Sequence, residues 1–207
     1  MAPDDYAELM QTRALALLLA GLVACTAGDR SMPEAPGIRD ADWKALWDQA
    51  GRVDTVGVAH LAEGDTVSGH EGLTVIESTV RFPEAAAGSE VFAWEIHART
   101  LAPVKLIIVR YDDLGQQYEL IGESETLVPH QTGLNRFVLQ EPIPVRRGDL
   151  YGLHMPAAEA VPFKEVMNWQ TLITTRGLSR PFMPRDHFAM YGWRFSARVF
   201  YRPTRDE

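Results

Sequence analysis

Residues 53–207 repeatedly alternate polar and apolar side chains, and this alternation most constrains how the chain can fold. In the run 91–99, for example, Phe92, Trp94 and Ile96 share one face, while Glu95 and His97 share the other. Successive side chains point to opposite faces in a strand, and turn-forming residues separate the runs at short intervals. The expected strands are 73–82, 91–99, 104–111, 118–124, 135–140, 150–154, 166–171 and 194–201. Short strands at this spacing predict a mostly β domain, an antiparallel sandwich or barrel.

An uncharged apolar run, 14–24, lies near the N-terminus, between Arg13 and Cys25. Its length suits the core of a signal peptide and falls short of the roughly 20 apolar residues that span a bilayer. The acidic stretch before Met10 is unusual ahead of a signal peptide, whereas Met10 begins an ordinary positive flank, so translation starts at Met1 or at Met10. We predict that residues 1–25 are a signal peptide and that the chain is exported.

The residues Leu22-Val23-Ala24-Cys25 resemble the lipobox of bacterial lipoproteins. The resemblance implies that the Cys25 thiol receives a lipid and that Cys25 becomes the membrane-anchored first residue of the mature chain. An ordinary cleaved signal with an incidental Cys25 is the alternative, because its cleavage site also favours small residues. In diderm bacteria the residue after the Cys generally directs the sorting of such lipoproteins, and Thr26 is not the Asp that signals retention. The resemblance therefore implies a place in the cell envelope, at the outer membrane in a diderm organism.

Two short segments separate this leader from the β-rich domain. Residues 26–37 are poor in large apolar side chains and contain two prolines, which indicates a tether. Residues 38–52 show the helical period, with Asp40 as a suitable N-cap and Gly51 as a suitable end. The apolar stripe of this amphipathic helix is Trp43, Leu46, Trp47 and Ala50. We expect the stripe to pack against the domain at 53–207, although its tryptophans could instead form a sugar platform.

Charge and cysteine content exclude several classes of protein. The chain has 28 acidic against 20 basic residues, a formal net charge of −8. Nucleic-acid binding needs an excess of Lys and Arg against the phosphates, so we predict no nucleic-acid partner. The one cysteine allows no intrachain disulfide and no Cys-based zinc site. The domain must therefore be held together by its hydrophobic core.

The segment 133–153 contains a recognisable order of elements. A strand leads through Pro142-Ile143-Pro144-Val145 to Gly148-Asp149 and then into an apolar strand. Gly148 can adopt the positive φ of a tight turn, and Asp149 can accept hydrogen bonds from nearby backbone amides. This order resembles secreted bacterial jelly-roll domains, and the resemblance extends over residues 73–160. It implies a jelly-roll-like β-sandwich and identifies no active site.

The search for catalytic motifs is mostly negative. The sequence contains no Gly-x-Ser-x-Gly elbow, no phosphate-binding Gly loop and no His-Glu-x-x-His helix, and we predict no metal and no cofactor. Glu95 and His97 lie two residues apart on one face of an expected strand, beside Arg99. They are candidates for proton transfer or ligand contact. A solvated polar face with cross-strand ion pairs is the alternative for the same residues.

Exposed aromatic rings can stack on the apolar face of a sugar, and Tyr191 and Trp193 share one face if residues 188–195 form a strand. Gly192 between them marks a bulge or a close backbone approach. The nearby segment 174–185 contains Gly177 and two prolines and is expected to be a long loop, a common place for binding residues.

These observations leave three hypotheses for function. The first is a surface-tethered binding or structural module, with a carbohydrate or an envelope component as ligand. The second is an envelope enzyme that acts on glycans through Glu95 and His97, and the third is a partner-binding subunit of an envelope complex. One cavity shared by Glu95, His97, Tyr191 and Trp193 would support the catalytic and stacking proposals, whereas scattered positions would count against both.

Overall fold

The computed structural model describes residues 40–176 and 182–204. The chain divides into two compact units, Met1–Pro33 and Glu34–Glu207. The first unit, with the predicted signal peptide and Cys25, lies outside the described residues, as does the predicted tether. All of the described residues belong to the second unit.

Strands are the main regular structure in the described residues of the second unit. One helix, α2 (Asp40–Ala50), precedes them, and two short 3₁₀ helices, η1 (Glu84–Ala86) and η2 (Arg185–His187), lie between strands. The strands are β1 (Asp54–Gly57), β2 (Glu71–Glu77), β3 (Ser89–Ala98), β4 (Lys105–Asp112), β5 (Gln117–Glu123), β6 (Gly133–Val145), β7 (Leu150–Ala157), β8 (Phe163–Glu165), β9 (Thr171–Thr174), β10 (Phe182–Pro184), β11 (Ala189–Tyr191), β12 (Trp193–Phe195) and β13 (Ala197–Pro203).

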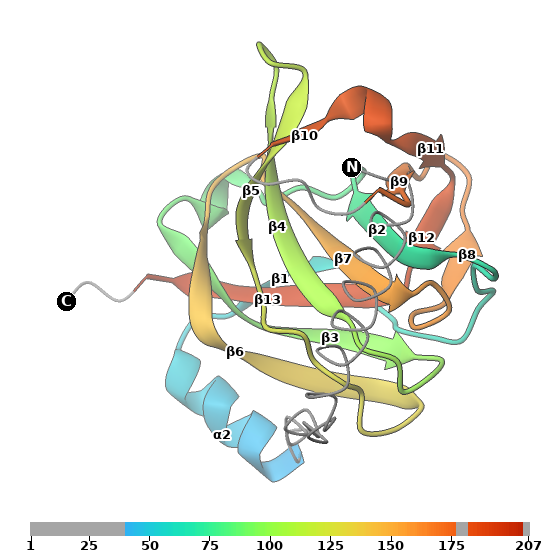
Figure 1. Ribbon diagram of the computed structural model, residues 1–207. Coiled ribbons are helices and arrows are strands. Elements are labelled where there is room, and N and C mark those ends of the chain that lie inside the picture. The colour runs from blue at the N-terminus through green and yellow to red at the C-terminus, as the bar shows by residue number, and fades with distance from the viewer. Residues whose placement is uncertain (1–39, 177–181, 205–207) are drawn as a thin grey trace, which may run out of the picture. The chain divides into compact units, whose positions relative to one another are not determined.

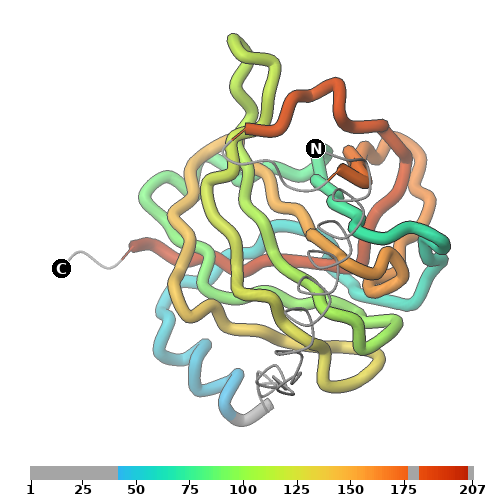
Figure 2. Tube along the Cα trace, in the orientation of Figure 1, coloured from blue at the N-terminus to red at the C-terminus, as the bar shows by residue number. Residues whose placement is uncertain are grey.

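These strands pair antiparallel in three sheets. A four-stranded sheet has the order β1-β13-β3-β6, a seven-stranded sheet has the order β10-β5-β4-β7-β2-β9-β11, and β12 pairs with β8 alone. Figures 1 and 2 show the long strands of the first sheet crossing those of the second. The prediction of a mostly β, antiparallel fold with one short N-terminal helix is confirmed.

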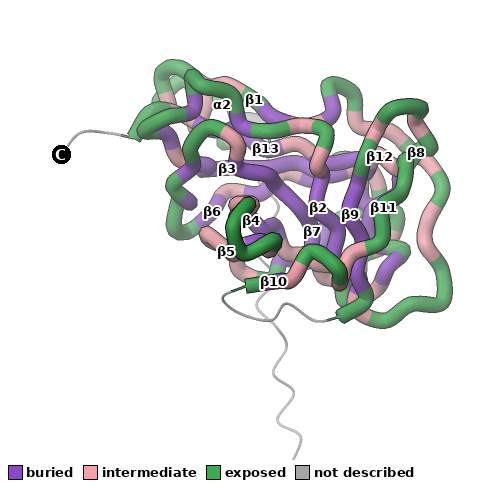
Figure 3. Tube along the Cα trace, turned by 90° about the horizontal axis from the view of Figure 1, so that it is seen from above, coloured by how far each residue is buried: buried purple, intermediate pink, exposed green. Residues whose placement is uncertain are grey.

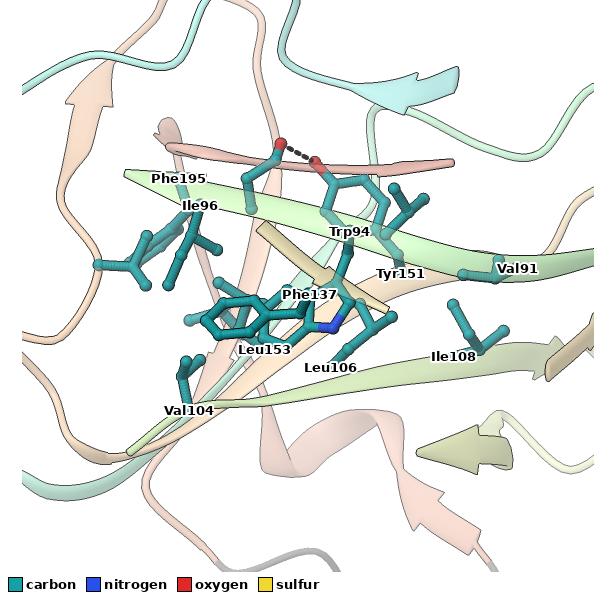
Figure 4. Close-up of a cluster of buried hydrophobic side chains, with 14 of the residues drawn as sticks. Val91, Trp94, Ile96, Val104, Leu106, Ile108, Phe137, Tyr151, Leu153 and Phe195 are labelled. Atoms are coloured by element: carbon teal, nitrogen blue, oxygen red, sulfur yellow. Dashed lines mark hydrogen bonds between the residues drawn. The ribbon is translucent and has the colours of Figure 1, made fainter. Parts of the chain in front are cut away.

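The main core fills the space between the two large sheets. Trp94 of β3 and Phe137 of β6 contact each other at a ring-centroid distance of 4.7 Å, and both meet residues of the opposite sheet such as Leu106. Figure 4 shows this cluster, in which the Tyr151 hydroxyl donates to the backbone carbonyl of Ala197. Burial of each large apolar side chain is worth about 1.5–3 kcal/mol, so this cluster dominates the stability of the unit.

A second apolar cluster covers the outer face of the seven-stranded sheet. In β2, Val75 belongs to the main core and Ile76 to this second cluster, so both faces of the strand are buried. The residues that cover the outer face include Phe188 and also Met183, which lies in the segment 174–185 that was expected to be a loop. That segment instead contains β10, which pairs with β5. In Figure 3 the buried course of β2 and β9 appears in purple.

Helix α2 packs on the outer face of the four-stranded sheet. Trp43, Leu46 and Trp47 lie against Phe92 and Phe200, and the ring centroids of Trp47 and Phe200 are 4.7 Å apart. The apolar stripe is therefore a docking face, as its spacing predicted. Its tryptophans are partly buried against the sheet rather than presented as a sugar platform.

Three expected strands have different limits in the structure. The expected strand 166–171 is a turn between β8 and β9, because Asn168 has a φ of 65° and breaks the extended backbone. The expected strand 73–82 ends at Glu77, where Ser78 and Thr79 turn their backbone N–H groups to the Gln170 carbonyl. The expected strand 194–201 is divided between β12 and β13, which pair in different sheets.

The turn at Gly148 and Asp149 forms as expected. Gly148 has a φ of 86°, which a side chain would make unfavourable. Asp149 Oδ2 accepts a hydrogen bond of 2.9 Å from the backbone N–H of Arg146. The turn leads into β7, and the backbone N–H groups of Arg146, Gly148 and Asp149 are all hydrogen-bonded.

Candidate binding site

One stretch of the chain contributes lining residues to two cavities. Strands β1, β13, β3 and β6 form one set of four, and β5, β4, β7 and β2 form a second set of four within the larger sheet. Residues 158–196, which we call the insertion, lie between β7 and β13 and add β8 to β12. Within it, β9 and β11 extend one edge of the seven-stranded sheet, and β10 extends the opposite edge.

The first cavity has a volume of about 280 Å³. This is near the lower end of the range for small-molecule sites, roughly 300–1,000 Å³, and suits a ligand of one or two rings. Its apolar residues include Leu73 and Ile173, which also belong to the main core. The residues that line it are Val67, His70, Leu73, Ile173, Thr174, Thr175, Arg176, His187, Ala189, Tyr191 and Trp193.

Three aromatic rings form one stack beside this cavity. The ring centroid of Trp193 lies 4.2 Å from that of Phe163 and 4.4 Å from that of Tyr191. The interplanar angles of these two pairs are 22° and 23°. Trp193 is therefore the middle ring of the stack, and Tyr191 is its outer ring. Tyr191 is 41% exposed. Tyr191 and Trp193 therefore lie side by side, and Tyr191 offers the accessible ring.

The backbone at Gly192 explains how the two rings come together. Tyr191 ends β11, which pairs with β9, and Trp193 begins β12, which pairs with β8. The Gly192 carbonyl accepts a hydrogen bond of 2.8 Å from the backbone N–H of Val166. The chain thus changes partner strands at Gly192, so the expected single strand 188–195 is two strands with a bend between them.

A buried carboxyl group lies beneath this region. Glu77, the last residue of β2, is 1% exposed. Its Oε1 accepts a hydrogen bond of 2.9 Å from the backbone N–H of Phe195, and its Oε2 accepts one of 2.5 Å from the indole N–H of Trp169. The hydroxyl of Thr171 lies 2.9 Å from Oε2. One side chain therefore ties β2 to β9, to β12 and to the turn at Trp169.

Burial raises the pKa of Glu77 from its ordinary value of 4.5 to about 7, although the bonds from Phe195, Trp169 and Thr171 and the charge of Arg194 lower it. The hydrogen bonding fits a neutral group. The Thr171 hydroxyl has one hydrogen but contacts two oxygens, those of the Glu77 carboxyl and the Trp193 carbonyl. Thr171 can donate to only one of these oxygens when Glu77 is ionised, whereas a protonated Glu77 donates to Thr171 and leaves the hydroxyl hydrogen for the Trp193 carbonyl.

Glu77 supports the wall of the first cavity rather than facing it, since it is absent from the residues that line either cavity. Sequence reasoning missed this residue. A single Glu at the end of a strand is usually exposed to solvent, and nothing local marks this one as buried. The partners that make its burial tolerable come from residues 169–195, which are distant in sequence.

Glu95 and His97 lie elsewhere, on β3 in the four-stranded sheet. The Glu95 carboxylate is buried and accepts hydrogen bonds from Arg136 at 2.9 Å and from Arg198 at 2.6 Å, one from each neighbouring strand. His97 Nδ1 is buried and has no hydrogen-bond partner among the described residues. Arg99 follows the end of β3 and is exposed. This is the cross-strand ion pairing that the sequence left open as the alternative.

The predicted candidates therefore do not share one cavity. Neither Glu95, His97 nor Arg99 lines the cavity beside Tyr191 and Trp193. That cavity instead gathers His70, His187 and Arg176, which the sequence did not single out. His70 precedes β2, His187 ends η2, and Arg176 follows β9, so only the tertiary fold brings them together.

A second cavity of about 510 Å³ lies on the other side of the chain between β10 and β11. Alternate residues of that chain face the two cavities: His187 and Tyr191 line the first, and Asp186 and Phe188 line the second. The second cavity also takes in Gln116 from the β4–β5 turn. The insertion thus forms part of the lining of both.

Two kinds of feature are absent from the described residues. Residues 40–176 and 182–204 contain no group of three or more His, Cys, Asp or Glu side chains arranged to hold a metal ion. Over the same ranges, no helix has the length and apolar character needed to cross a membrane. Comparisons with protein-family models, curated proteins and solved structures give no match to this chain. A functional assignment must therefore be argued from the geometry.

Proposed function

We propose that this chain is a cell-envelope binding module, lipid-anchored at Cys25, that binds a carbohydrate in the cavity beside Tyr191. The observation that carries the proposal is the stack of Phe163, Trp193 and Tyr191, which presents one exposed ring beside a cavity of monosaccharide to disaccharide size. A flat ring held rigid from behind can stack on the apolar face of a pyranose at little entropic cost.

The scaffold of the module is proposed to be a jelly-roll-like β-sandwich. Its support is the strand order in the two sets of four, β1-β13-β3-β6 and β5-β4-β7-β2. Numbered along the chain without the insertion, these are strands one, eight, three and six, and five, four, seven and two. That alternation between sheets is the order of a jelly roll with two Greek keys. In this scheme the insertion is an addition that the sandwich does not need.

The proposed location rests on the leader alone. The apolar run 14–24 and the lipobox-like residues ending at Cys25 support export and lipidation. In a diderm organism the anchored module would lie at the outer membrane, with the tether 26–37 separating it from the bilayer. The proposed partners are therefore the membrane, through the lipid, and a glycan, through the cavity.

Binding is favoured over catalysis by the groups that the cavity lacks. None of the described residues that line it is Asp or Glu, so these residues offer no carboxylate pair for glycoside hydrolysis. Glu95, the earlier candidate for proton transfer, is held between two guanidinium groups on another sheet. A carboxylate with both oxygens engaged in this way is poorly placed to exchange protons with a substrate.

The experiment is a glycan-array screen of the full chain, solubilised in a polyoxyethylene detergent that has no sugar headgroup. We expect saturable binding that Tyr191→Ala abolishes and Tyr191→Phe retains, because the ring rather than the hydroxyl makes the contact. Leu101→Ala is the matched control, since Leu101 is exposed but lies outside the cavity. Binding that survives Tyr191→Ala, or silence across the array, would overturn the proposal and direct the search to crosslinking of protein partners in the native envelope.

A further inference from the structure

The first cavity is lined by basic and neutral side chains. Its ionisable residues are His70, Arg176, His187 and Tyr191 among the lining residues that the structure describes, and none of these lining residues is acidic. The chain as a whole has 28 acidic against 20 basic residues, so a cavity with this lining departs from the composition around it. The Nε2 of His187 lies 4.0 Å from Oδ1 of Asp186, and Asp186 lines the second cavity.

The basic residues reach the cavity from three separate segments. His70 comes from the loop before β2, Arg176 from the end of β9 and His187 from η2. Thr174, which is buried, adds a hydroxyl to the lining and accepts a hydrogen bond of 3.1 Å from the backbone N–H of Arg176. This bond fixes the turn that carries Arg176 beside the cavity.

The geometry points to an acidic sugar, a pyranose that bears a carboxylate, as the ligand of this cavity. In this arrangement the sugar ring lies on Tyr191 and its carboxylate meets Arg176, with His70 and His187 as further hydrogen-bond donors. A guanidinium matches a carboxylate with two parallel hydrogen bonds, and such charge-assisted bonds are roughly twice as strong as neutral ones. The inference rests on the proposed function, because it assigns the chemical class of the carbohydrate at that same site.

The test uses glycans in matched pairs that differ only in the carboxylate: glucuronides with glucosides, galacturonides with galactosides, and sialylated glycans with their carboxyl-reduced forms. The full chain in polyoxyethylene detergent is titrated with each pair on the array. We expect affinity for one acidic member to exceed that for its neutral partner by about tenfold or more, as one charge-assisted bond provides. Arg176→Gln should remove that preference while leaving weak binding to the ring.

The controls separate the two claims. Arg147→Gln removes an exposed arginine that is outside the cavity and should leave the preference unchanged. Binding that depends on Tyr191 but does not distinguish acidic from neutral members would overturn the acidic-sugar inference and leave the proposed function standing. A preference that persists in Arg176→Gln would overturn it as well. Absence of any Tyr191-dependent binding would overturn both.

Discussion

The guanidinium of Arg110 donates two hydrogen bonds to the carboxylate of Asp149, from Nε to Oδ1 at 2.7 Å and from Nη2 to Oδ2 at 2.9 Å. Arg110 lies on β4 and Asp149 precedes β7, so the pair joins two neighbouring strands at the turn. Asp149 is fully buried. The same carboxylate closes the turn through Arg146, and its removal should therefore affect two structural features at once.

We expect Asp149→Ala to destabilise the protein by about 3 kcal/mol, because it leaves the backbone amide of Arg146 and a partly buried guanidinium without an acceptor. Urea unfolding measures the change. Glu84→Ala is the matched control: its ion pair with Arg147 has side chains that are 74% and 73% exposed, and the cost should stay below about 1 kcal/mol. Equal losses in the two variants would contradict this assignment.

The buried Glu77 should make stability fall as pH rises. The folded pKa of about 7 lies above the ordinary value of 4.5, so the folded protein holds the proton through a range in which the unfolded chain has lost it. The contribution is fully present below pH 4.5 and is lost as pH rises to 7. The difference corresponds to about 3 kcal/mol.

Glu77→Gln stays neutral throughout and should lack this dependence. The free energy of unfolding of the variant, minus that of the natural chain, should therefore rise by about 3 kcal/mol between pH 4.5 and pH 8. Urea unfolding at a series of pH values measures this difference. Glu71→Gln, at an exposed position of the same strand, is the control. Parallel curves for Glu77→Gln and the natural chain would show that Glu77 is ionised in the fold.

Trp193 and Tyr191 should have separable roles. Trp193→Ala removes the middle ring of the stack and should cost about 3 kcal/mol of unfolding free energy, because Phe163 and Tyr191 both lose their partner. Tyr191→Ala removes the outer ring and should cost about 1 kcal/mol or less while abolishing glycan binding. Thermal unfolding gives both values. A larger loss for Tyr191→Ala than for Trp193→Ala would reverse the two assignments.

The docking of α2 depends on Trp47. Trp47→Ala removes the ring that contacts Phe200 and Phe92 and should destabilise the docked helix by about 3 kcal/mol. Amide hydrogen exchange over Asp40–Ala50 should then accelerate more than exchange in the main core. Lys44→Ala, on the exposed side of the same helix, should leave the exchange rates unchanged. Unaltered protection in Trp47→Ala would show that the helix is held by other contacts.

The proposed lipid anchor has a direct test. Cys25→Ser should release the chain from the membrane fraction, because the hydroxyl cannot take the place of the modified thiol. Mass spectrometry of the natural chain should show a lipid on Cys25. A chain that carries no lipid, or that stays in the membrane fraction as Cys25→Ser, would support the alternative of an ordinary cleaved signal.

The sequence was sufficient for features that depend on local periodicity. Alternation along residues 91–99 located β3, and the 3.6-residue spacing of Trp43, Leu46 and Trp47 located α2 and its buried face. It was insufficient where a third layer covers a strand. Val75 and Ile76 lie on opposite faces of β2, yet both are buried, because the outer surface with Ile76 is covered by a cluster that includes Met183 and Phe188. No pattern in the sequence of β2 predicts that its outer surface is buried.

The candidate site was only partly predictable for a similar reason. Tyr191 and Trp193 were found because they are two residues apart in sequence, but the place of Phe163 behind Trp193 depends on the pairing of β8 with β12. Arg176 and His70 approach the same cavity from segments about 100 residues apart. Side chains gathered over such distances leave no signature in a single sequence, and only the fold identifies them as neighbours.

The position of β13 in the four-stranded sheet bears on how a newly made chain can fold. β13 lies between β1 and β3, which do not pair with each other, and it contributes Val199 and Tyr201 to the main core. A ribosome delivers residues 54–57 and 89–98 long before 197–203. The sheet therefore cannot close on the nascent chain, and its completion waits for contacts that are far apart in sequence and slow to form. Such a delay keeps the polypeptide extended for longer, the state in which an unfolded chain can thread a narrow secretion pore.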